Sequence, residues 1–361
     1  MTHRPEAVAK KLAERELDLL LVSHLVNVRW LTGFTGSAGA AVVGVGEGPG
    51  TRRFLTDFRY LTQSEEQLDA SWEREIVQDL LEGVAKGLPT DRAVRLGFDD
   101  EHMPVKQHAR LLELVPDGVE LVAAGGLIEE LRMVKDAEEV ERIRAAALLA
   151  DAALENVIGR GLAGRTERDV ALDLEHEVRV MGAQGMSFPS IVASGAHGAL
   201  PHAVPRDVEI PEGVLVTIDW GVQLDGYASD CTRTYATGAI PDSHRDVYEL
   251  VQRAQAAGLA AVRPGPTGKE VDAVARAVIE EAGHGEHFGH GLGHGVGMEV
   301  HEGPRLSRQG DVALAAGHVV TVEPGVYIPG EVGVRIEDLV VVTADGCDVL
   351  STLPKDLTIV H

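Results

Sequence analysis

The chain has 361 residues, of which 44% are hydrophobic and 25% charged, as expected of a globular protein with a sizeable core. At roughly 150 residues per domain, this length predicts two domains. The 57 Asp and Glu outnumber the 33 Lys and Arg, and the net charge of −24 argues against a nucleic-acid partner and against anionic membrane surfaces.

Cysteine usage and the first residues favour a cytoplasmic protein. Cys231 and Cys347 are the only two cysteines and lie far apart, which excludes a disulfide framework and a Cys-x-x-Cys metal site. Residues 1–18 contain no apolar core of a secretion signal, and the longest apolar runs are too short to span a membrane.

The first 127 residues are predicted to form a smaller α/β domain. Helices are expected at residues 5–16, 80–87 and 105–115, and strands at 18–23, 28–31, 40–45, 53–56 and 94–98. Glycine-rich turns, such as residues 46–50, separate these elements. Their alternation along the chain is typical of an α/β domain.

Residues 128–361 are predicted to form an α+β domain, after a boundary region at residues 126–135. Helices are expected at 136–158, from a capped start at 166–169 to 181, at 244–262 and at 268–282. Strands are expected at 191–194, 214–220, 230–237, 319–323 and 333–343. Because these helices and strands come in blocks, they favour an antiparallel sheet.

Four carboxylates interrupt strands that otherwise read as core. Asp219 and Asp230 flank an Asp-Gly turn, which predicts a hairpin with both aspartates facing one pocket. The period of two places Glu323 on one strand face with Thr321, and Glu337 on one face with Arg335. One such acid could face solvent, but four in one domain point to pairing or metal binding, because a bare buried carboxylate is costly.

A stretch rich in histidine and glycine follows. Residues 284–302 read HGEHFGHGLGHGVGMEVHE and include His290, His294 and His301, whereas His202 lies in a proline-flanked loop. So many glycines exclude an ordinary helix and predict a tight loop or strand whose backbone approaches a ligand closely.

The absence of other catalytic motifs and the types of ligand present narrow the possible chemistry. The chain has no H-E-x-x-H, dinucleotide, P-loop or G-x-S-x-G motif. Four carboxylates with imidazole and no thiolate favour Mn²⁺, Co²⁺ or Zn²⁺, and they offer enough donors for two ions about 3.5–4 Å apart. Water bridging two such ions becomes a hydroxide near neutral pH, so the pattern predicts a hydrolase.

The order Asp219, Asp230, His294, Glu323 and Glu337 resembles the metal ligands of the pita-bread metallopeptidases. The flanking motifs SDCTRT (229–234), HGLGHG (290–295), EVHE (299–302), TVEPG (321–325) and RIE (335–337) resemble that family as well. The resemblance covers about residues 130–361. It implies a pita-bread catalytic domain and two divalent ions, with Mn²⁺ the first expectation and Co²⁺ or Zn²⁺ the alternatives.

The same resemblance implies a role for each site residue. Asp219 would bind one metal, His294 and Glu323 the other, and Asp230 and Glu337 would bridge them. Glu323 would also act as general acid and base. His202 and His301 would stabilise the oxyanion and the scissile carbonyl, His290 would line the substrate pocket, and Arg335 would hold the carboxylates in place.

The preceding creatinase-like domain resembles that of Xaa-Pro aminopeptidases and Xaa-Pro dipeptidases (prolidases). Residues 30–37 and 56–60 resemble the bacterial aminopeptidases more, so the expected activity is cleavage of the N-terminal Xaa-Pro bond of peptides by a metal-bridging hydroxide. The alternative is an Xaa-Pro dipeptidase, which should bind the proline carboxylate with arginine; Arg29 and Arg59 are candidates. More remote alternatives are a non-catalytic binding module and a metal-free creatinase-like hydrolase. The resemblance also implies a homodimer.

Overall fold

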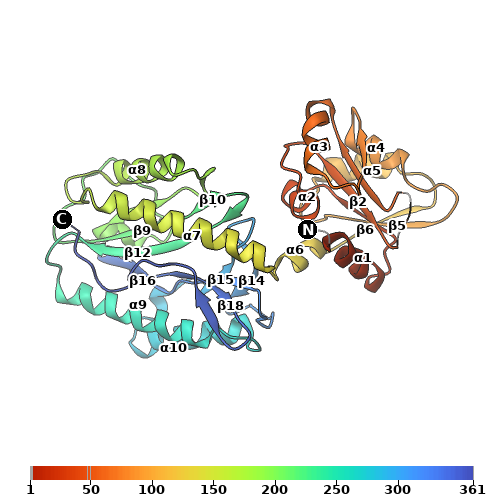
Figure 1. Ribbon diagram of the computed structural model, residues 1–361. Coiled ribbons are helices and arrows are strands. Elements are labelled where there is room, and N and C mark those ends of the chain that lie inside the picture. Colours follow the sequence, from red (N-terminus) through yellow and green to blue (C-terminus); the bar gives the residue numbers. More distant parts are fainter. Residues whose placement is uncertain (1–2, 47, 49, 361) are drawn as a thin grey trace. The chain divides into compact units, whose positions relative to one another are not determined.

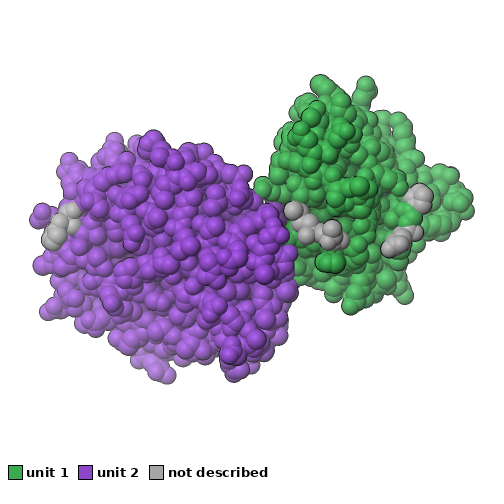
Figure 2. All heavy atoms as spheres, viewed as in Figure 1, with its two compact units in different colours: residues 1–132 green, residues 133–361 purple. Residues whose placement is uncertain are grey.

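A computed structural model describes residues 3–46, 48 and 50–360 of the chain. The chain divides into two compact units, residues 1–132 and 133–361, called unit 1 and unit 2 below (Figure 2). The sequence placed the boundary after residue 127. The structural division comes after Arg132 because helix α6 (Leu127–Arg132) packs against helices α1 and α2 of unit 1.

Unit 1 is built on a six-stranded mixed sheet with the order β4-β3-β2-β1-β5-β6. The pairs β1–β5, β5–β6 and β3–β4 are parallel, and β1–β2 and β2–β3 are antiparallel. Its strands are β1 (Leu19–Val22), β2 (Ala40–Gly44), β3 (Arg52–Thr56), β4 (Glu73–Ile76), β5 (Val94–Phe98) and β6 (Val119–Ala123). Its other helices are α1 (Arg4–Glu14), α2 (Leu25–Thr32), α3 (Leu61–Gln67), α4 (Leu80–Lys86) and α5 (Val105–Leu114).

The strand expected at residues 28–31 is wrong, because these residues lie within helix α2. The helix buries Val28, Leu31 and Thr32, which a helical period places on one face, and Gly33 ends it with a φ of 81°. An apolar run this short has too few turns for its period to separate helix from strand.

Unit 2 combines four long helices with antiparallel strands, as predicted. The helices are α7 (Ala137–Ile158), α8 (Glu167–Val180), α9 (Asp242–Ala261) and α10 (Gly268–Glu281). In Figure 1, α7 and α8 lie along one face of the strands and α9 and α10 along the other. Capping boxes start α7, α8 and α10, and the box at Thr166 and Asp169 is the one read from the sequence.

The strands of unit 2 form two main sheets, in the orders β12-β9-β8 and β14-β13-β15-β18-β19. Their members are β8 (Ile191–Ser194), β9 (Leu215–Trp220), β12 (Cys231–Ala236), β13 (Gly293–Gly295), β14 (Glu302–Leu306), β15 (Val319–Val322), β18 (Asp338–Val342) and β19 (Cys347–Val349). Smaller strands are β7 (Gly185–Met186), β10 (Val222–Leu224), β11 (Tyr227–Ala228), β16 (Gly325–Ile328) and β17 (Val332–Arg335). The fully buried Trp220 donates a hydrogen bond from Nε1 to the carbonyl of Ala150 (2.9 Å), which ties β9 to α7.

The single strand expected at residues 333–343 is two strands. β17 pairs with β16, and β18 pairs with β15 in another sheet. The chain changes partner at Glu337, whose backbone N–H donates to the carbonyl of Thr232 on β12 (3.1 Å). Continuous apolar alternation gives no sign of such a change of sheet. No helix in the described part of the chain is both long and apolar enough to cross a membrane.

Candidate active site

Five strands or strand ends bring the five predicted metal ligands together. Asp219 lies on β9, Asp230 directly precedes β12, His294 lies on β13, Glu323 follows β15, and Glu337 joins β17 to β18. Oxygen atoms of Asp219, Asp230 and Glu337 lie within 4.8 Å of one another. His294 Nε2 lies 3.3 Å from Glu323 Oε1 and 3.5 Å from Asp230 Oδ2. Asp230 therefore links the two halves of the cluster.

Strand register explains why the two aspartates meet. In the hairpin of β9 and β12, Asp219 pairs with Thr232 and Trp220 with Cys231. Asp230 and Thr232 are two residues apart and share a strand face, whereas Cys231 packs into the core on the opposite face. The hairpin expected from the Asp-Gly turn is present, extended at its tip by β10 and β11.

Burial makes it costly for these carboxylates to be ionised without a compensating positive charge. Desolvation raises the pKa of Asp230 and Glu337 well above the ordinary carboxyl values, and neighbouring carboxylates raise both further. Desolvation also raises the pKa of Asp219, although Arg335 opposes the shift. Among the described residues, Asp219 Oδ1 and Glu337 Oε1 are buried without a hydrogen-bond donor. Clustered, donor-free carboxylate oxygens fit divalent cations of the Mn²⁺, Co²⁺ or Zn²⁺ type.

Glu323 and His294 are hydrogen-bond partners within the cluster. Burial opposes ionisation of Glu323, but the hydrogen bond and charge of His294 outweigh it and lower the pKa of Glu323 to about 2. Thr321 supports both residues, since its hydroxyl donates to Glu323 Oε1 (3.1 Å) and accepts the backbone N–H of His294 (3.0 Å). The period of two had placed Thr321 beside Glu323 without assigning it this contact.

Arg335 connects the carboxylates to Tyr327 of the cavity wall. Its guanidinium donates to Asp219 Oδ2 (2.6 Å), to the Tyr327 hydroxyl (2.8 Å) and to the Thr232 hydroxyl (3.0 Å). Thr232 in turn donates to Glu337 Oε2 (2.8 Å). The sequence predicted that Arg335 would hold the carboxylates, but Thr232 carried no signal because the residue is typical of strands.

Arg335→Lys is expected to lower kcat/KM and metal affinity by about 10- to 100-fold, since an ammonium cannot reproduce the three directed contacts of the guanidinium. Steady-state kinetics and metal titration would measure both effects. Arg308→Lys is the matched control, because Arg308 follows β14 in the chain and its side chain is exposed. Equal losses in both variants would contradict a positioning role for Arg335.

A cavity of about 470 Å³ opens beside the carboxylates. It is lined by His202, His290 and His301 and by every other predicted site residue except Glu337, which is 1% exposed. The rings of His294 and His301 have centroids 4.3 Å apart, and His290 Nε2 lies 2.9 Å from the Tyr327 hydroxyl. Apolar side chains complete the wall, and none of them was singled out in the sequence: Phe188, Pro189, Ile191, Pro201, Val204 and Pro205.

The glycines of the histidine-rich stretch serve strand packing as much as the cavity. A Cβ on Gly293 would lie 2.0 Å from the carbonyl oxygen of Thr321, and one on Gly295 would lie 2.0 Å from that of Gly303. The sequence predicted a close backbone approach to a ligand. The closest approach is instead to β15 and β14, although Gly291 and Gly293 do line the cavity.

A buried glutamate missed in the sequence fastens the loop that carries His202. Glu167, at the first turn of α8, accepts hydrogen bonds from Ser194, His197 and Arg206. Ser194 and Arg206 bracket the loop segment that contributes Pro201 to Pro205 to the cavity wall. The sequence had marked only the Thr166 cap beside it.

Arg59, a sequence candidate for binding a substrate carboxylate, is engaged within unit 1. Its Nη2 lies 2.6 Å from Asp57 Oδ2, and its Nε donates to Asp57 Oδ1 (2.9 Å). Asp57 caps the short 3₁₀ turn that contains Arg59, so the ion pair is local.

Comparisons with known proteins agree with this architecture. Residues 4–134 match the creatinase/prolidase N-terminal domain. The Xaa-Pro dipeptidase of Pyrococcus horikoshii is 33% identical over 99% of both chains. The structure of the Xaa-Pro dipeptidase from Bacillus anthracis has a TM-score of 0.93 at 37% identity over 99% of both chains. That of the X-Pro aminopeptidase from Thermotoga maritima has a TM-score of 0.88 at 34% identity, over 96% of this chain and 99% of that one.

These similarities span both units, and they confirm the predicted creatinase-like domain followed by a pita-bread domain. Residues 141–344, which contain all five predicted metal ligands, match metallopeptidase family M24. The chain therefore belongs to metallopeptidase family M24 and is a hydrolase of that family.

Proposed function

We propose that this protein is an Xaa-Pro dipeptidase that uses two divalent metal ions, Mn²⁺ being the first expectation. The observation that carries the proposal is the cavity itself, which is lined by three carboxylates and His294 together with apolar, proline-rich side chains, while Glu337 lies buried beside Asp219 and Asp230. The aminopeptidase reading favoured by the sequence now takes second place, because the relatives from Pyrococcus horikoshii and Bacillus anthracis, which match over 99% of both chains, are named Xaa-Pro dipeptidases. A cytoplasmic location and a homodimer are further parts of the proposal.

The chain's own residues have separable tasks in this proposal. Asp219, Asp230, His294, Glu323 and Glu337 hold the metal ions, which when bound acidify water and polarise the scissile carbonyl. Glu323 accepts a proton from the attacking water and delivers it to the departing proline nitrogen. His202 and His301 donate hydrogen bonds to the oxygen on which charge develops. His290, held by Tyr327, lines the pocket for the substrate side chains.

Proline specificity follows from the lining of the cavity. The bond before proline is a tertiary amide without N–H, so recognition must rely on the shape of the ring rather than on a backbone hydrogen bond. Pro201, Val204, Pro205 and Phe188 offer an apolar surface for the ring. We infer that this surface selects proline at the second position of the substrate.

A dipeptidase also needs a cation for the free carboxylate of proline, and Arg305 is the candidate in unit 2. It is exposed on β14. It follows His301 of the cavity wall by four residues in the chain, and burial, together with the charges of His294, His202 and Arg305, lowers the pKa of His301. Arginine is well suited to such a task because its guanidinium matches a carboxylate in a bidentate geometry.

The activity is tested by comparing hydrolysis of Ala-Pro and Ala-Pro-Ala by the Mn²⁺-loaded protein, with and without a chelator. Chelator-sensitive cleavage of Ala-Pro with little cleavage of Ala-Pro-Ala is the expected result. Preference for the tripeptide would restore the aminopeptidase assignment. Cleavage that survives complete metal removal would favour a metal-free hydrolase, and no cleavage of either peptide would favour a binding module.

Arg305→Ala is expected to raise the KM for Ala-Pro about 10-fold or more, in line with the loss of one charge-assisted hydrogen-bond pair, and to leave kcat much less affected. Ala-Pro-amide lacks the carboxylate, so its KM should change little. Arg308→Ala removes a nearby exposed arginine and serves as the control. If Arg305→Ala affects the acid and the amide equally, Arg305 does not read the carboxylate.

A further inference from the structure

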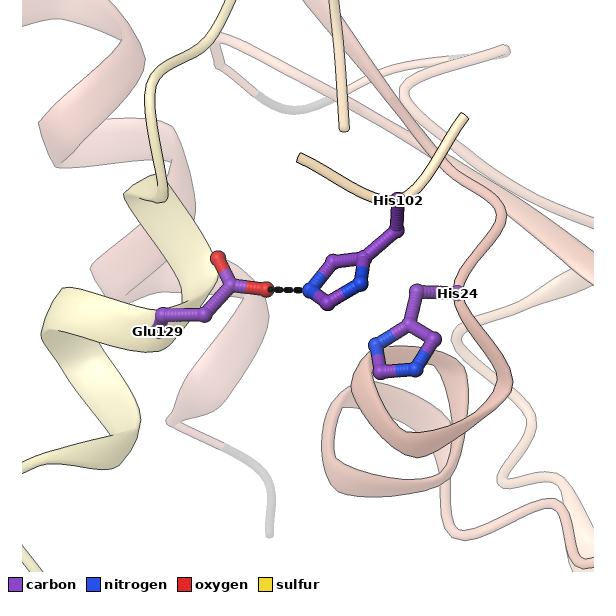
Figure 3. Close-up of side chains that lie close together, drawn as sticks. All are labelled: His24, His102 and Glu129. Carbon is purple, nitrogen blue, oxygen red and sulfur yellow. Dashed lines mark hydrogen bonds and ion pairs between the residues drawn. The ribbon is translucent and has the colours of Figure 1, made fainter. Parts of the chain in front are cut away.

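A second group of side chains that could hold a metal ion lies within unit 1 (Figure 3). It is formed at one edge of the sheet, where the parallel neighbours β1, β5 and β6 end. His24 follows β1, His102 follows β5, and Glu129 lies on α6, which follows β6. The carboxyl ends of parallel strands are a common place for ligand sites, because the chain leaves the sheet there in loops that converge.

The three side chains are close enough to share one ion. One potential ligand atom from each lies within 4.8 Å of the others. His102 Nε2 is 3.1 Å from Glu129 Oε1, as the dashed line in Figure 3 marks. The two imidazole rings are stacked, with centroids 3.7 Å apart and planes 12° apart. Donors around a tetrahedral zinc ion are roughly 3.4 Å apart, close to the separation of His102 Nε2 and Glu129 Oε1.

Surrounding residues hold these side chains in position. Asn27 Nδ2 donates to Glu129 Oε1 (2.6 Å), and Arg132 Nη1 donates to Asn27 Oδ1 (2.7 Å). Asp99 Oδ2 accepts the backbone N–H groups of Ser23 (3.0 Å) and His24 (3.1 Å). Hydrogen bonds of this kind around a set of ligands are typical of metal sites, where they orient the ligands.

We propose that His24, His102 and Glu129 bind one zinc ion, with water as the fourth ligand. Two imidazoles and one carboxylate form a set that zinc favours, and they differ from the carboxylate-rich set of unit 2. The lone pairs of stacked rings run parallel, so one ring must turn about its Cβ–Cγ bond when the ion binds. The His102 side chain is 28% exposed, so its ring is the one that borders solvent and would turn.

The test measures zinc per chain in the full-length protein, His102→Ala and Glu129→Gln. Each protein is equilibrated with a small excess of zinc, freed of unbound metal by gel filtration and assayed by atomic emission. The site of unit 2 is unaltered in all three, so a difference between them reports unit 1. Both variants are expected to retain one zinc ion fewer per chain than the wild type, with unchanged circular dichroism.

His108→Ala is the matched control, because His108 is another histidine of unit 1, on α5. Its ring packs against that of Phe98, with centroids 4.9 Å apart. It should retain the wild-type amount of zinc. Wild-type zinc content in both His102→Ala and Glu129→Gln would overturn the proposal, as would an equal loss in His108→Ala. Glu129→Gln keeps the shape of the side chain, so the test survives a folding defect in His102→Ala.

Discussion

Glu337→Gln is expected to abolish hydrolysis of Xaa-Pro peptides, with a loss of at least about 1,000-fold in kcat/KM. Glu337 is 1% exposed and lies with Asp219 and Asp230 in the carboxylate cluster, so its side chain belongs to the centre of the site. In the proposed function Glu337 would help to hold the metal ions, so its loss should forfeit several kcal/mol of transition-state stabilisation, and each 1.36 kcal/mol corresponds to about tenfold in rate. Steady-state kinetics with saturating Mn²⁺ would measure the loss.

In the metal-free protein, by contrast, the same substitution should increase thermal stability. Burial and the charges of Glu323 and Asp219 raise the pKa of Glu337 well above its ordinary value, which means that the empty fold disfavours its negative charge. A neutral amide removes this repulsion, so in chelator Glu337→Gln should unfold at a higher temperature than the wild type. Added Mn²⁺ should raise the Tm of the wild type much more than that of the variant.

Glu331→Gln removes a carboxylate from the exposed turn between β16 and β17 and is the control. It should keep wild-type turnover and the wild-type response to Mn²⁺. Wild-type turnover in Glu337→Gln would refute the assignment of Glu337 as a metal ligand.

Glu167→Ala is expected to lower the free energy of unfolding by about 3 kcal/mol, because it removes a fully buried carboxylate and leaves the donors around it without an acceptor. The Glu167 side chain is fully buried, and its partners Ser194, His197 and Arg206 would lose their common acceptor. Denaturant titration would measure the loss. Glu177→Gln is the control on the same helix, since Glu177 pairs with Arg160 at the surface, and it should change stability little.

Activity should fall in the Glu167 variants as well, through the loop that carries His202. With the loop ends at Ser194 and Arg206 released, kcat for Ala-Pro should decrease about 10- to 100-fold under conditions in which the protein remains folded. Glu167→Gln retains the size of the side chain and part of its hydrogen bonding, so it should recover part of the activity. An unchanged kcat in folded Glu167→Ala would show that the anchor serves stability alone.

The pH dependence of stability provides a further readout of Glu167. Burial opposes its charge, but hydrogen bonds from Arg206 and Ser194 outweigh burial and lower its pKa to about 2 from the ordinary 4.5. A carboxyl whose pKa is lowered by folding stabilises the protein fully at pH values above its pKa in the unfolded chain. This stabilisation is lost as the pH falls from about 4.5 to 2. Glu167→Gln should therefore lack the part of the acid destabilisation that the wild type shows in this window.

Several features of this protein follow from local sequence patterns. Carboxylates on strands with a period of two placed Glu323 beside Thr321, and an Asp-Gly turn placed Asp219 and Asp230 on one hairpin. These inferences succeeded because strand alternation and turn chemistry depend on neighbours in the chain. The same kind of inference was wrong at residues 28–31 and incomplete at residues 333–343, where a short apolar run and a change of sheet left no local sign.

The sequence by itself determined the fold class, the two-domain order, the family resemblance and the residues that converge in unit 2. Only the tertiary structure decided which distant side chains support them: Thr232 between Arg335 and Glu337, Glu167 across the His202 loop, and Glu129 beside His24 and His102. The physical reason is that strand periodicity assigns a side chain to a face, whereas its partners on that face come from other elements. Those partners are set by packing and register across the sheet, which no local pattern encodes.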